Sequence, residues 1–222
     1  MDIKALVFDF DGVITDTEPV HMEAWLSVLE NLGISFDEEE YRLNYLGLND
    51  RDFLDAVGRI HGRHFDDAEK ADLIGQKSEG ALRMLEHDIP LLPGVREFVE
   101  EEASRGRLLA ICSGANRGEI EYILRRLKWR DLFDPIIASD SVVRGKPDPE
   151  GYIRALEGLQ KKAKDLLLPE NVVAIEDSPK GVAAAKAAGM RCVAVGLGFA
   201  PAELAQADGV FPSLAEVDLK AL

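Results

Sequence analysis

Short apolar runs alternate with amphipathic segments along most of this chain. The apolar runs have the length and composition of β-strands, and they cover residues 3–9, 107–112, 135–138, 172–176, 191–195 and 208–211. From residue 94 onward, apolar positions at helical spacing fill the segments between them: 94–104, 116–127, 149–160 and 179–188. Strands that alternate with helices are typical of a parallel sheet covered on both faces. The pattern therefore predicts an α/β fold with a doubly wound parallel sheet.

The segment between the first two expected strands has a different pattern. Residues 18–90 contain no strand-like run, and their apolar positions favour helices over 20–32, 37–45, 49–60 and 66–85. Asn49 is a suitable N-cap for the third of these helices. A block of helices within an α/β chain indicates a separate unit. We expect a core domain of residues 1–17 and 91–222, with an all-helical domain of residues 18–90 inserted after the first strand.

The charge and composition limit the classes of function. The 222 residues carry a formal net charge of −15, which argues against a nucleic-acid partner because phosphate backbones attract clustered Lys and Arg. No apolar run approaches the ~18 residues of a membrane span, and the first residues lack the features of a signal peptide. Cys112 and Cys192 lie in apolar runs, so we expect buried free thiols, as in a reducing cytosol. The sequence thus predicts a cytoplasmic protein without a membrane or nucleic-acid partner, either a monomer or a dimer.

Two carboxylates directly follow the first apolar run. Asp9 and Asp11 stand two residues apart, and Gly12 comes next. Carboxylates are disfavoured at the end of a buried strand unless their charge is compensated. A hard cation such as Mg²⁺, which prefers oxygen ligands, would provide that compensation. Open α/β sheets also place their ligand sites outside the carboxyl ends of the strands, so this segment is a candidate site.

Three more polar clusters accompany the later strands: Ser113-Gly114 with Asn116, Gly145-Lys146-Pro147, and Glu176-Asp177. Together with Asp9-x-Asp11-Gly12 they form four motifs whose order resembles the haloacid dehalogenase-like hydrolase superfamily, over essentially the whole chain. This resemblance implies a Rossmann-like core with a four-helix cap, phosphoryl transfer through an aspartyl-phosphate, and Mg²⁺ as the cofactor. In the superfamily such caps close over the site, exclude water and contribute specificity residues.

The four clusters divide the expected chemistry among them. Asp9 is the candidate nucleophile because it is the first acid at the strand end, and a carboxylate nucleophile splits ester hydrolysis into two easier steps. The Asp11 side chain points to the same side of the extended segment, where it can protonate the leaving oxygen and then deprotonate water. Ser113 and nearby backbone N–H groups, including that of Gly114, are expected to hydrogen-bond a phosphoryl oxygen. Lys146 would stabilise negative charge during transfer.

The acidic clusters also supply candidate metal ligands. We expect Asp9 and Asp177 to bind Mg²⁺ directly and Glu176 to bind it through water. The resemblance adds the backbone carbonyl of Asp11 as a further ligand. Asn116 has two interpretations, because it could bind phosphate or cap the helix over 116–127.

Candidate specificity residues lie in the expected helical cap. Thr17 and His21 stand at the hinge, and Arg51 and Lys77 offer positive charge for a part of the substrate distant from the transferring phosphate. Arg51 ends the segment 47–51, which reads Gly-Leu-Asn-Asp-Arg. The alternative for Arg51 and Lys77 is a solvated helix face, and the alternative for His21 is a packing role. The sequence leaves both alternatives open.

The motifs favour a Mg²⁺-dependent phosphatase acting on a small phosphorylated metabolite, such as a sugar phosphate or phosphoglycolate. A β-phosphoglucomutase is the alternative, because residues 9–17 resemble the opening of that enzyme, and His21 and Lys77 fall where a mutase has histidine and lysine. The segment 47–51 and the residues after Ser113 depart from the mutase pattern. A non-catalytic protein that keeps the fold is a third interpretation, against which the complete set of acids and Lys146 argues.

Overall fold

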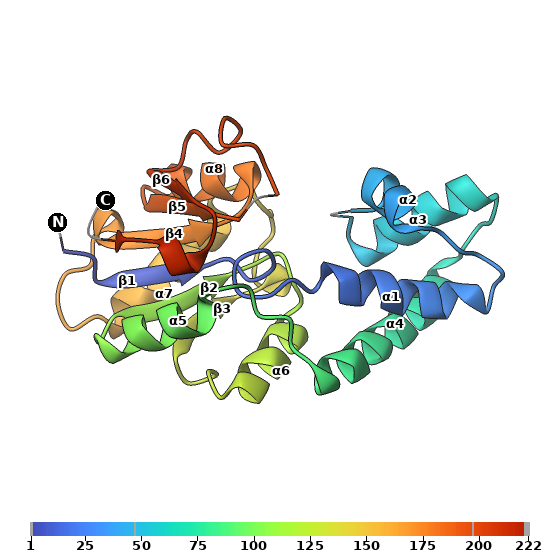
Figure 1. Ribbon diagram of the computed structural model, residues 1–222, viewed down its shortest axis with the longest axis horizontal. Coiled ribbons are helices and arrows are strands. Elements are labelled where there is room, and N and C mark those ends of the chain that lie inside the picture. The colour runs from blue at the N-terminus through green and yellow to red at the C-terminus, as the bar shows by residue number, and fades with distance from the viewer. Residues whose placement is uncertain (1, 47, 197, 220–222) are drawn as a thin grey trace. The chain divides into compact units, whose positions relative to one another are not determined.

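The computed structural model describes residues 2–46, 48–196 and 198–219. The chain divides into two compact units, one formed by Met1–Asp16 with Pro90–Leu222 and the other by Thr17–Ile89. We call the first the core unit and the second the helical unit (Figure 1). Within the described residues, all strands belong to the core unit.

The core unit is built on a six-stranded parallel sheet with the order β3-β2-β1-β4-β5-β6 (Figure 1). Its strands are β1 (Ala5–Phe8), β2 (Leu108–Cys112), β3 (Phe133–Ile137), β4 (Val172–Glu176), β5 (Arg191–Val195) and β6 (Gly209–Phe211). The chain runs outward from β1 to β3, returns to the other side of β1 and continues through β4 to β6. The strand order therefore reverses between β1 and β4, which is where open α/β sheets bind their ligands.

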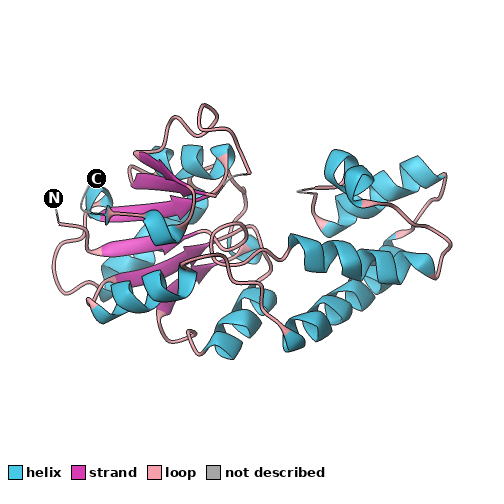
Figure 2. Ribbon diagram, viewed as in Figure 1, coloured by secondary structure: helices cyan, strands magenta, loops and turns pink. Residues whose placement is uncertain are grey.

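Helices cover both faces of this sheet (Figure 2). They are α5 (Val95–Ser104), α6 (Arg117–Leu127), α7 (Glu150–Lys162) and α8 (Pro179–Ala187), with the short 3₁₀ helices η1 (Ser139–Ser141), η2 (Pro169–Asn171) and η3 (Leu214–Glu216). Successive residues of β1 point to opposite faces. Ala5 and Val7 join the apolar cluster formed with α7 and α8, whereas the Phe8 ring packs edge-on against Phe98 of α5, with ring centroids 6.1 Å apart. All four residues of β1 are buried, as expected for a central parallel strand.

The helical unit consists, in its described residues, of α1 (Glu18–Glu30), α2 (Glu38–Asn44), α3 (Asp50–His61) and α4 (Asp67–His87). Three of these helices begin at side-chain caps, since Asp37, Asn49 and Asp66 accept hydrogen bonds from backbone N–H groups of the first turn. The helices enclose an aromatic cluster in which Trp25 stacks on Phe53, with ring centroids 4.5 Å apart. The N-cap predicted at Asn49 is confirmed.

The elements lie close to the positions that the sequence predicts. β3 begins at Phe133, two residues before its expected start, because the residue before Pro135 is restricted to extended backbone and extends the strand. Cys112 and Cys192 are buried and free, as expected. Across the described part of the chain, no helix combines the length and apolar composition needed to cross a membrane.

Candidate active site

Asp9 lies directly after β1, at the point where the strand order reverses. Its backbone N–H donates to the carbonyl of Ile175 in β4 at 2.9 Å, so the end of β1 is tied to the neighbouring strand. Its side chain accepts a hydrogen bond from the N–H of Phe10 at 2.8 Å, and the residue is 8% exposed. Asp9 is therefore a nearly buried carboxylate held at the carboxyl edge of the sheet.

The turn after Asp9 depends on Gly12. Gly12 has a φ of +78°, a conformation that glycine adopts without steric cost, and its N–H donates to the carbonyl of Thr15 at 2.8 Å. An added Cβ would lie 2.1 Å from Asp177 Oδ2. The glycine of the Asp-x-Asp-Gly motif thus leaves room for the Asp177 carboxylate as well as permitting the turn.

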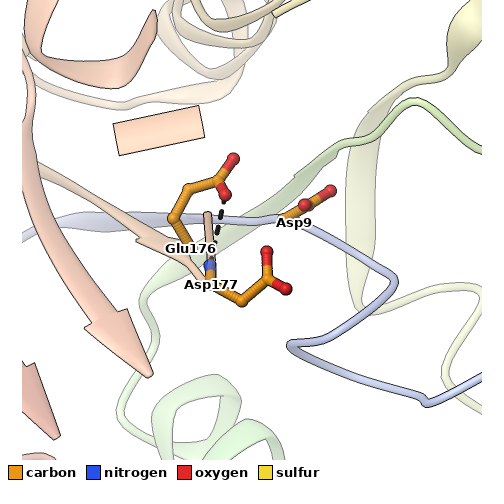
Figure 3. A group of neighbouring side chains, drawn as sticks. All are labelled: Asp9, Glu176 and Asp177. Carbon is orange, nitrogen blue, oxygen red and sulfur yellow. Dashed lines mark hydrogen bonds between the residues drawn. The ribbon is translucent and has the colours of Figure 1, made fainter. Parts of the chain in front are cut away.

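Three carboxylates gather at this edge, where Glu176 and Asp177 extend from the end of β4 beside Asp9 (Figure 3). One oxygen of each lies within 4.8 Å of the others. Burial and the charges of Glu176 and Asp177 raise the pKa of Asp9 to about 8, although Lys146 acts in the opposite direction. Burial and the charge of Glu176 raise the pKa of Asp177 to about 6, and Asp11, which is half-buried, adds to that rise.

Lys146 is the cation of this site. From the loop ahead of α7, its Nζ lies 2.9 Å from Asp9 Oδ1 and 2.5 Å from Glu176 Oε1. Burial alone would lower the pKa of the Lys146 ammonium, but the charges of Asp9 and Glu176 outweigh it and raise that pKa above its ordinary value. The structure thus brings the expected nucleophile and the expected lysine into direct contact.

Glu176 ends β4 and is fully buried. Its Oε1 accepts a hydrogen bond from the hydroxyl of Tyr152 at 2.6 Å. Its Oε2 accepts from the N–H of Asp177 at 3.2 Å and from the hydroxyl of Ser178 at 3.3 Å. An added Cβ at Gly181 would lie 1.9 Å from Glu176 Cδ. The carboxylate is therefore enclosed by donors of the chain itself, and position 181 has no room for a side chain.

Tyr152 and Gly181 are absent from the candidates drawn from the sequence. Tyr152 lies on the buried face of α7, where a tyrosine hydroxyl needs a hydrogen-bond partner. A tyrosine on the apolar face of an expected helix is therefore the sequence feature that could have indicated Tyr152. Gly181 lies inside α8, and a glycine inside a helix indicates a packing reason because it weakens the helix.

The polar residues after β2 have different contacts. Ser113 is 7% exposed, and its Oγ accepts a hydrogen bond from the N–H of Ala115 at 3.0 Å. Gly114 is exposed. Asn116 caps α6, since its Oδ1 accepts from the N–H of Gly118 at 2.8 Å. The capping interpretation of Asn116 therefore describes its observed contact, and phosphate binding by Ser113 and Gly114 remains a prediction.

Thr17 and His21 lie one helical turn apart at the start of α1. The N–H of His21 donates to the carbonyl of Thr17 at 3.0 Å. Thr17 is buried and His21 is half-buried. Gly47, which opens the segment 47–51, lies outside the described residues. A role for Thr17 or His21 toward substrate remains a prediction.

The two expected cap cations are both paired with carboxylates of the helical unit. Arg51 Nη1 lies 3.1 Å from Asp67 Oδ1, and both side chains are largely exposed. Lys77 is buried, with its Nζ 2.8 Å from Asp50 Oδ1 and 5.7 Å from the centre of the Trp25 ring. The solvated helix face describes Arg51, but it is wrong for Lys77, because the ion pair and the ring hold that side chain inside the unit.

The carboxylate oxygens of the core site are suitable ligands for a hard divalent cation. Among the described residues here, three carboxylates, of Asp9, Glu176 and Asp177, are opposed by the ammonium of Lys146. Two negative charges are thus left without a counter-charge in a buried setting, which is costly. The raised pKa values of Asp9 and Asp177 express that cost. Carboxylate oxygens are the ligands that Mg²⁺ prefers.

Comparison with known proteins agrees with this geometry. Residues 3–189 match the model of a hydrolase family described as haloacid dehalogenase-like hydrolase. The chain belongs to this family. The matched stretch contains all four motifs, from Asp9 to Asp177, and the expected resemblance is confirmed.

Two relatives and a solved structure are similar to this haloacid dehalogenase-like hydrolase over most of its length. A phosphorylated carbohydrates phosphatase of Thermotoga maritima is 35% identical over 188 residues, which cover 85% of this chain and 82% of that protein. A β-phosphoglucomutase of Bacillus subtilis is 32% identical over 201 residues, which cover 88% of this chain and 84% of that protein. A crystal structure of mutant CbbY from Rhodobacter sphaeroides with xylulose-(1,5)bisphosphate has a TM-score of 0.82, with 30% identity and 99% of each chain covered. The predicted α/β class with a parallel sheet is thereby confirmed.

Proposed function

We propose that this chain is a Mg²⁺-dependent phosphatase that hydrolyses a small phosphorylated metabolite, of the sugar phosphate type, through an aspartyl-phosphate at Asp9. The observation that carries the proposal is the contact between Asp9 and Lys146 at the switch point of the sheet, beside two more carboxylates. Phosphoryl transfer to a carboxylate needs a nucleophile, a cation for the phosphoryl group and ligands for a metal ion. The T. maritima relative, named for phosphatase activity on phosphorylated carbohydrates, supports the substrate class.

In the proposed reaction, a carboxylate oxygen of Asp9 attacks phosphorus, and the bond from phosphorus to the ester oxygen breaks. Asp11 gives its proton to the departing oxygen, while Lys146 offsets negative charge on the phosphoryl oxygens. Ser113 and the N–H of Gly114 hold those oxygens by hydrogen bonds. Asp11 then takes a proton from water, whose oxygen attacks the phosphorus of the aspartyl-phosphate. Inorganic phosphate leaves, and Asp9 regains its free carboxylate.

Four residues would hold the metal ion: Asp9 and Asp177 directly, Glu176 through water, and Asp11 through its backbone carbonyl. When bound, the cation supplies positive charge that lessens repulsion between the carboxylates and a phosphate group and favours the ionised form of Asp9. That ionised form is the nucleophile. Burial and the neighbouring charges raise the pKa of Asp9 to about 8, so at neutral pH the carboxylate needs such a counter-charge.

The mutase alternative has support from the B. subtilis relative. A mutase must hold a second anionic group of a bisphosphate while water is kept out, and Arg51 and Lys77 are the candidates for that task. Both cations are engaged with carboxylates of their own unit. Residues 17–89 also contain seventeen Asp and Glu against seven Lys and Arg, a formal charge of −10. These charges favour hydrolysis of a monophosphate.

The test is a screen of purified protein with sugar monophosphates, phosphoglycolate, nucleotides and β-glucose 1-phosphate, each with and without Mg²⁺. We expect Mg²⁺-dependent release of inorganic phosphate from a sugar monophosphate. Asp9→Asn protein should release none, because an amide is a poor nucleophile.

Two results would overturn the proposal. Glucose 6-phosphate formed from β-glucose 1-phosphate and a bisphosphate activator faster than phosphate is released would establish the mutase. Phosphate release by folded Asp9→Asn protein, shown by mass spectrometry to be free of deamidation, would remove Asp9 as the nucleophile.

A further inference from the structure

Tyr152 contacts two charged groups of the site, the Glu176 carboxylate and the Lys146 ammonium, from the interior of the core unit. It lies in α7 with no exposed surface, and its hydroxyl donates to Glu176 Oε1 at 2.6 Å. The Lys146 Nζ lies 5.5 Å from the centre of its ring, within the range of a cation–π contact. One side chain therefore touches both the carboxylate and the ammonium that flank Asp9.

The position of Lys146 depends on how Glu176 is held. Asp9 Oδ1 and Glu176 Oε1 lie 2.9 Å and 2.5 Å from the Lys146 Nζ, so two carboxylates share one ammonium. The Tyr152 hydroxyl occupies the same oxygen of Glu176 from the core side. Without that hydrogen bond, Glu176 Oε1 would keep Lys146 as its remaining charged partner, and we expect it to draw the ammonium closer to itself and away from Asp9.

Tyr152 is also fixed firmly enough to act in this way. It belongs to the apolar cluster that joins α7 and α8 to β1, β2, β4 and β5. Burial and the charge of Glu176 raise the pKa of Tyr152 well above its ordinary value, so its hydroxyl keeps the proton that it donates. The residue before it in α7, Gly151, packs closely on β2, since an added Cβ there would lie 2.7 Å from Cys112 Sγ. This close packing fixes the backbone of α7 next to Tyr152.

We propose that Tyr152 is a positioning residue of the active site, which holds Glu176 and through it sets Lys146 against the phosphoryl group. This role rests on the proposed phosphatase function. It assigns to α7 a part in catalysis that the four motifs do not include. The consequence is specific, because loss of the hydroxyl should weaken the stabilisation of the transferring phosphoryl group while leaving the helical unit unchanged.

The test compares Tyr152→Phe with Tyr45→Phe. Both substitutions remove from a buried tyrosine a hydroxyl that donates to a glutamate, since Tyr45 donates to Glu40 Oε1 at 2.7 Å in the helical unit. Partners that orient the groups around a metal site typically change activity about 10–100-fold when they are lost. We therefore expect Tyr152→Phe to lower kcat by about 10–100-fold with KM nearly unchanged, and Tyr45→Phe to keep the wild-type kcat.

A second readout does not depend on turnover. Orthovanadate adopts the five-coordinate geometry of a phosphoryl group in transfer, and its binding in the presence of Mg²⁺ can be measured by calorimetry. Tyr152→Phe should weaken orthovanadate binding by a factor similar to its loss in kcat. Glu176→Gln tests the same contact from its other side, and combining it with Tyr152→Phe should lower kcat no further than Glu176→Gln alone.

The outcomes separate this inference from the proposed function. If Tyr152→Phe lowers Tm as Tyr45→Phe does but keeps wild-type kcat and orthovanadate binding, Tyr152 is structural only and the inference is wrong. Additive losses in the double variant would also refute action through Glu176. If the wild-type protein releases phosphate from no ester and binds no orthovanadate, the proposed function fails, and the role of Tyr152 fails with it.

Discussion

Gly181 provides a direct test of how tightly Glu176 is held. Replacing it with alanine adds a methyl group to α8 at a point 1.9 Å from Glu176 Cδ and 2.0 Å from each of its carboxylate oxygens. Carbon atoms in contact lie about 3.5–4.0 Å apart, so the carboxylate must move by roughly 1.5 Å. A movement of that size breaks its contacts with Tyr152 and Lys146.

The size of the effect follows from those two contacts. A hydrogen bond to a charged group contributes about 1.5–3 kcal/mol, and alanine in a helix regains about 0.5–1 kcal/mol relative to glycine. Gly181→Ala should therefore lower the free energy of unfolding by about 2–5 kcal/mol. In a chain of this length, that corresponds to a fall of roughly 5–20 °C in Tm. The rate of phosphate release should fall as well, because Lys146 loses its fixed partner.

The assay compares thermal unfolding of wild type, Gly181→Ala and Gly75→Ala by circular dichroism. Gly75 is an exposed glycine inside α4, and among the described residues its added Cβ would meet no atom within 4 Å. Gly75→Ala should raise the free energy of unfolding by about 0.5–1 kcal/mol. If both variants gained stability to the same extent, Glu176 would have room to spare, and the account of a tightly enclosed carboxylate would be refuted.

The acidic residues give the remaining predictions. Asp11→Asn should slow hydrolysis of alkyl phosphates by about 10²–10⁴-fold and affect aryl phosphates, with their better leaving groups, much less; equal losses would exclude Asp11 as the acid. Asp177→Ala should raise the Mg²⁺ concentration needed for half-maximal rate, and an unchanged requirement would exclude direct ligation. Mg²⁺ should bind more tightly as the pH rises past the pKa values of Asp177, about 6, and Asp9, about 8, since the ion displaces protons below them; calorimetry showing an affinity independent of pH would contradict this. Without Mg²⁺ both acids bind protons more strongly in the folded than in the unfolded chain, so the free energy of unfolding should fall as the pH rises toward 8. A free energy of unfolding that increased over this pH range would contradict the raised pKa values.

Local pattern was sufficient for most of the fold. β4 and β5 occupy the predicted residues 172–176 and 191–195, because a strand buried on both faces is a continuous apolar run with polar ends. Asn49 and Asn116 cap their helices through contacts two or three residues away, which a sequence displays directly. β3 starts earlier than predicted because the exposed Asp134 separates Phe133 from the rest of its apolar pattern.

The candidate site was predictable in part for the same reason. Asp9, Glu176 and Asp177 each stand at the end of an apolar run, and parallel strands bring such ends to one edge. Contacts between side chains on different elements leave no periodic trace in a sequence. The hydrogen bond from Tyr152 to Glu176 and the burial of Lys77 are of this kind, and they emerge only when α7 meets β4 and when α3 meets α4.

The place of β1 in the centre of the sheet has a consequence for biosynthesis. Ala5 pairs with Leu108 on one side and with Val172 on the other. At about 5–20 residues per second, the ribosome needs roughly 10–30 s to make the stretch that separates β1 from β4. The helical unit is continuous from Thr17 to Ile89, so all of its own contacts are available much earlier. Asp9 is thus translated before the other candidate site residues, and its neighbours Glu176 and Asp177 are the last of the cluster to be made. The acidic cluster is therefore complete only once β4 pairs with β1, a contact of large sequence separation.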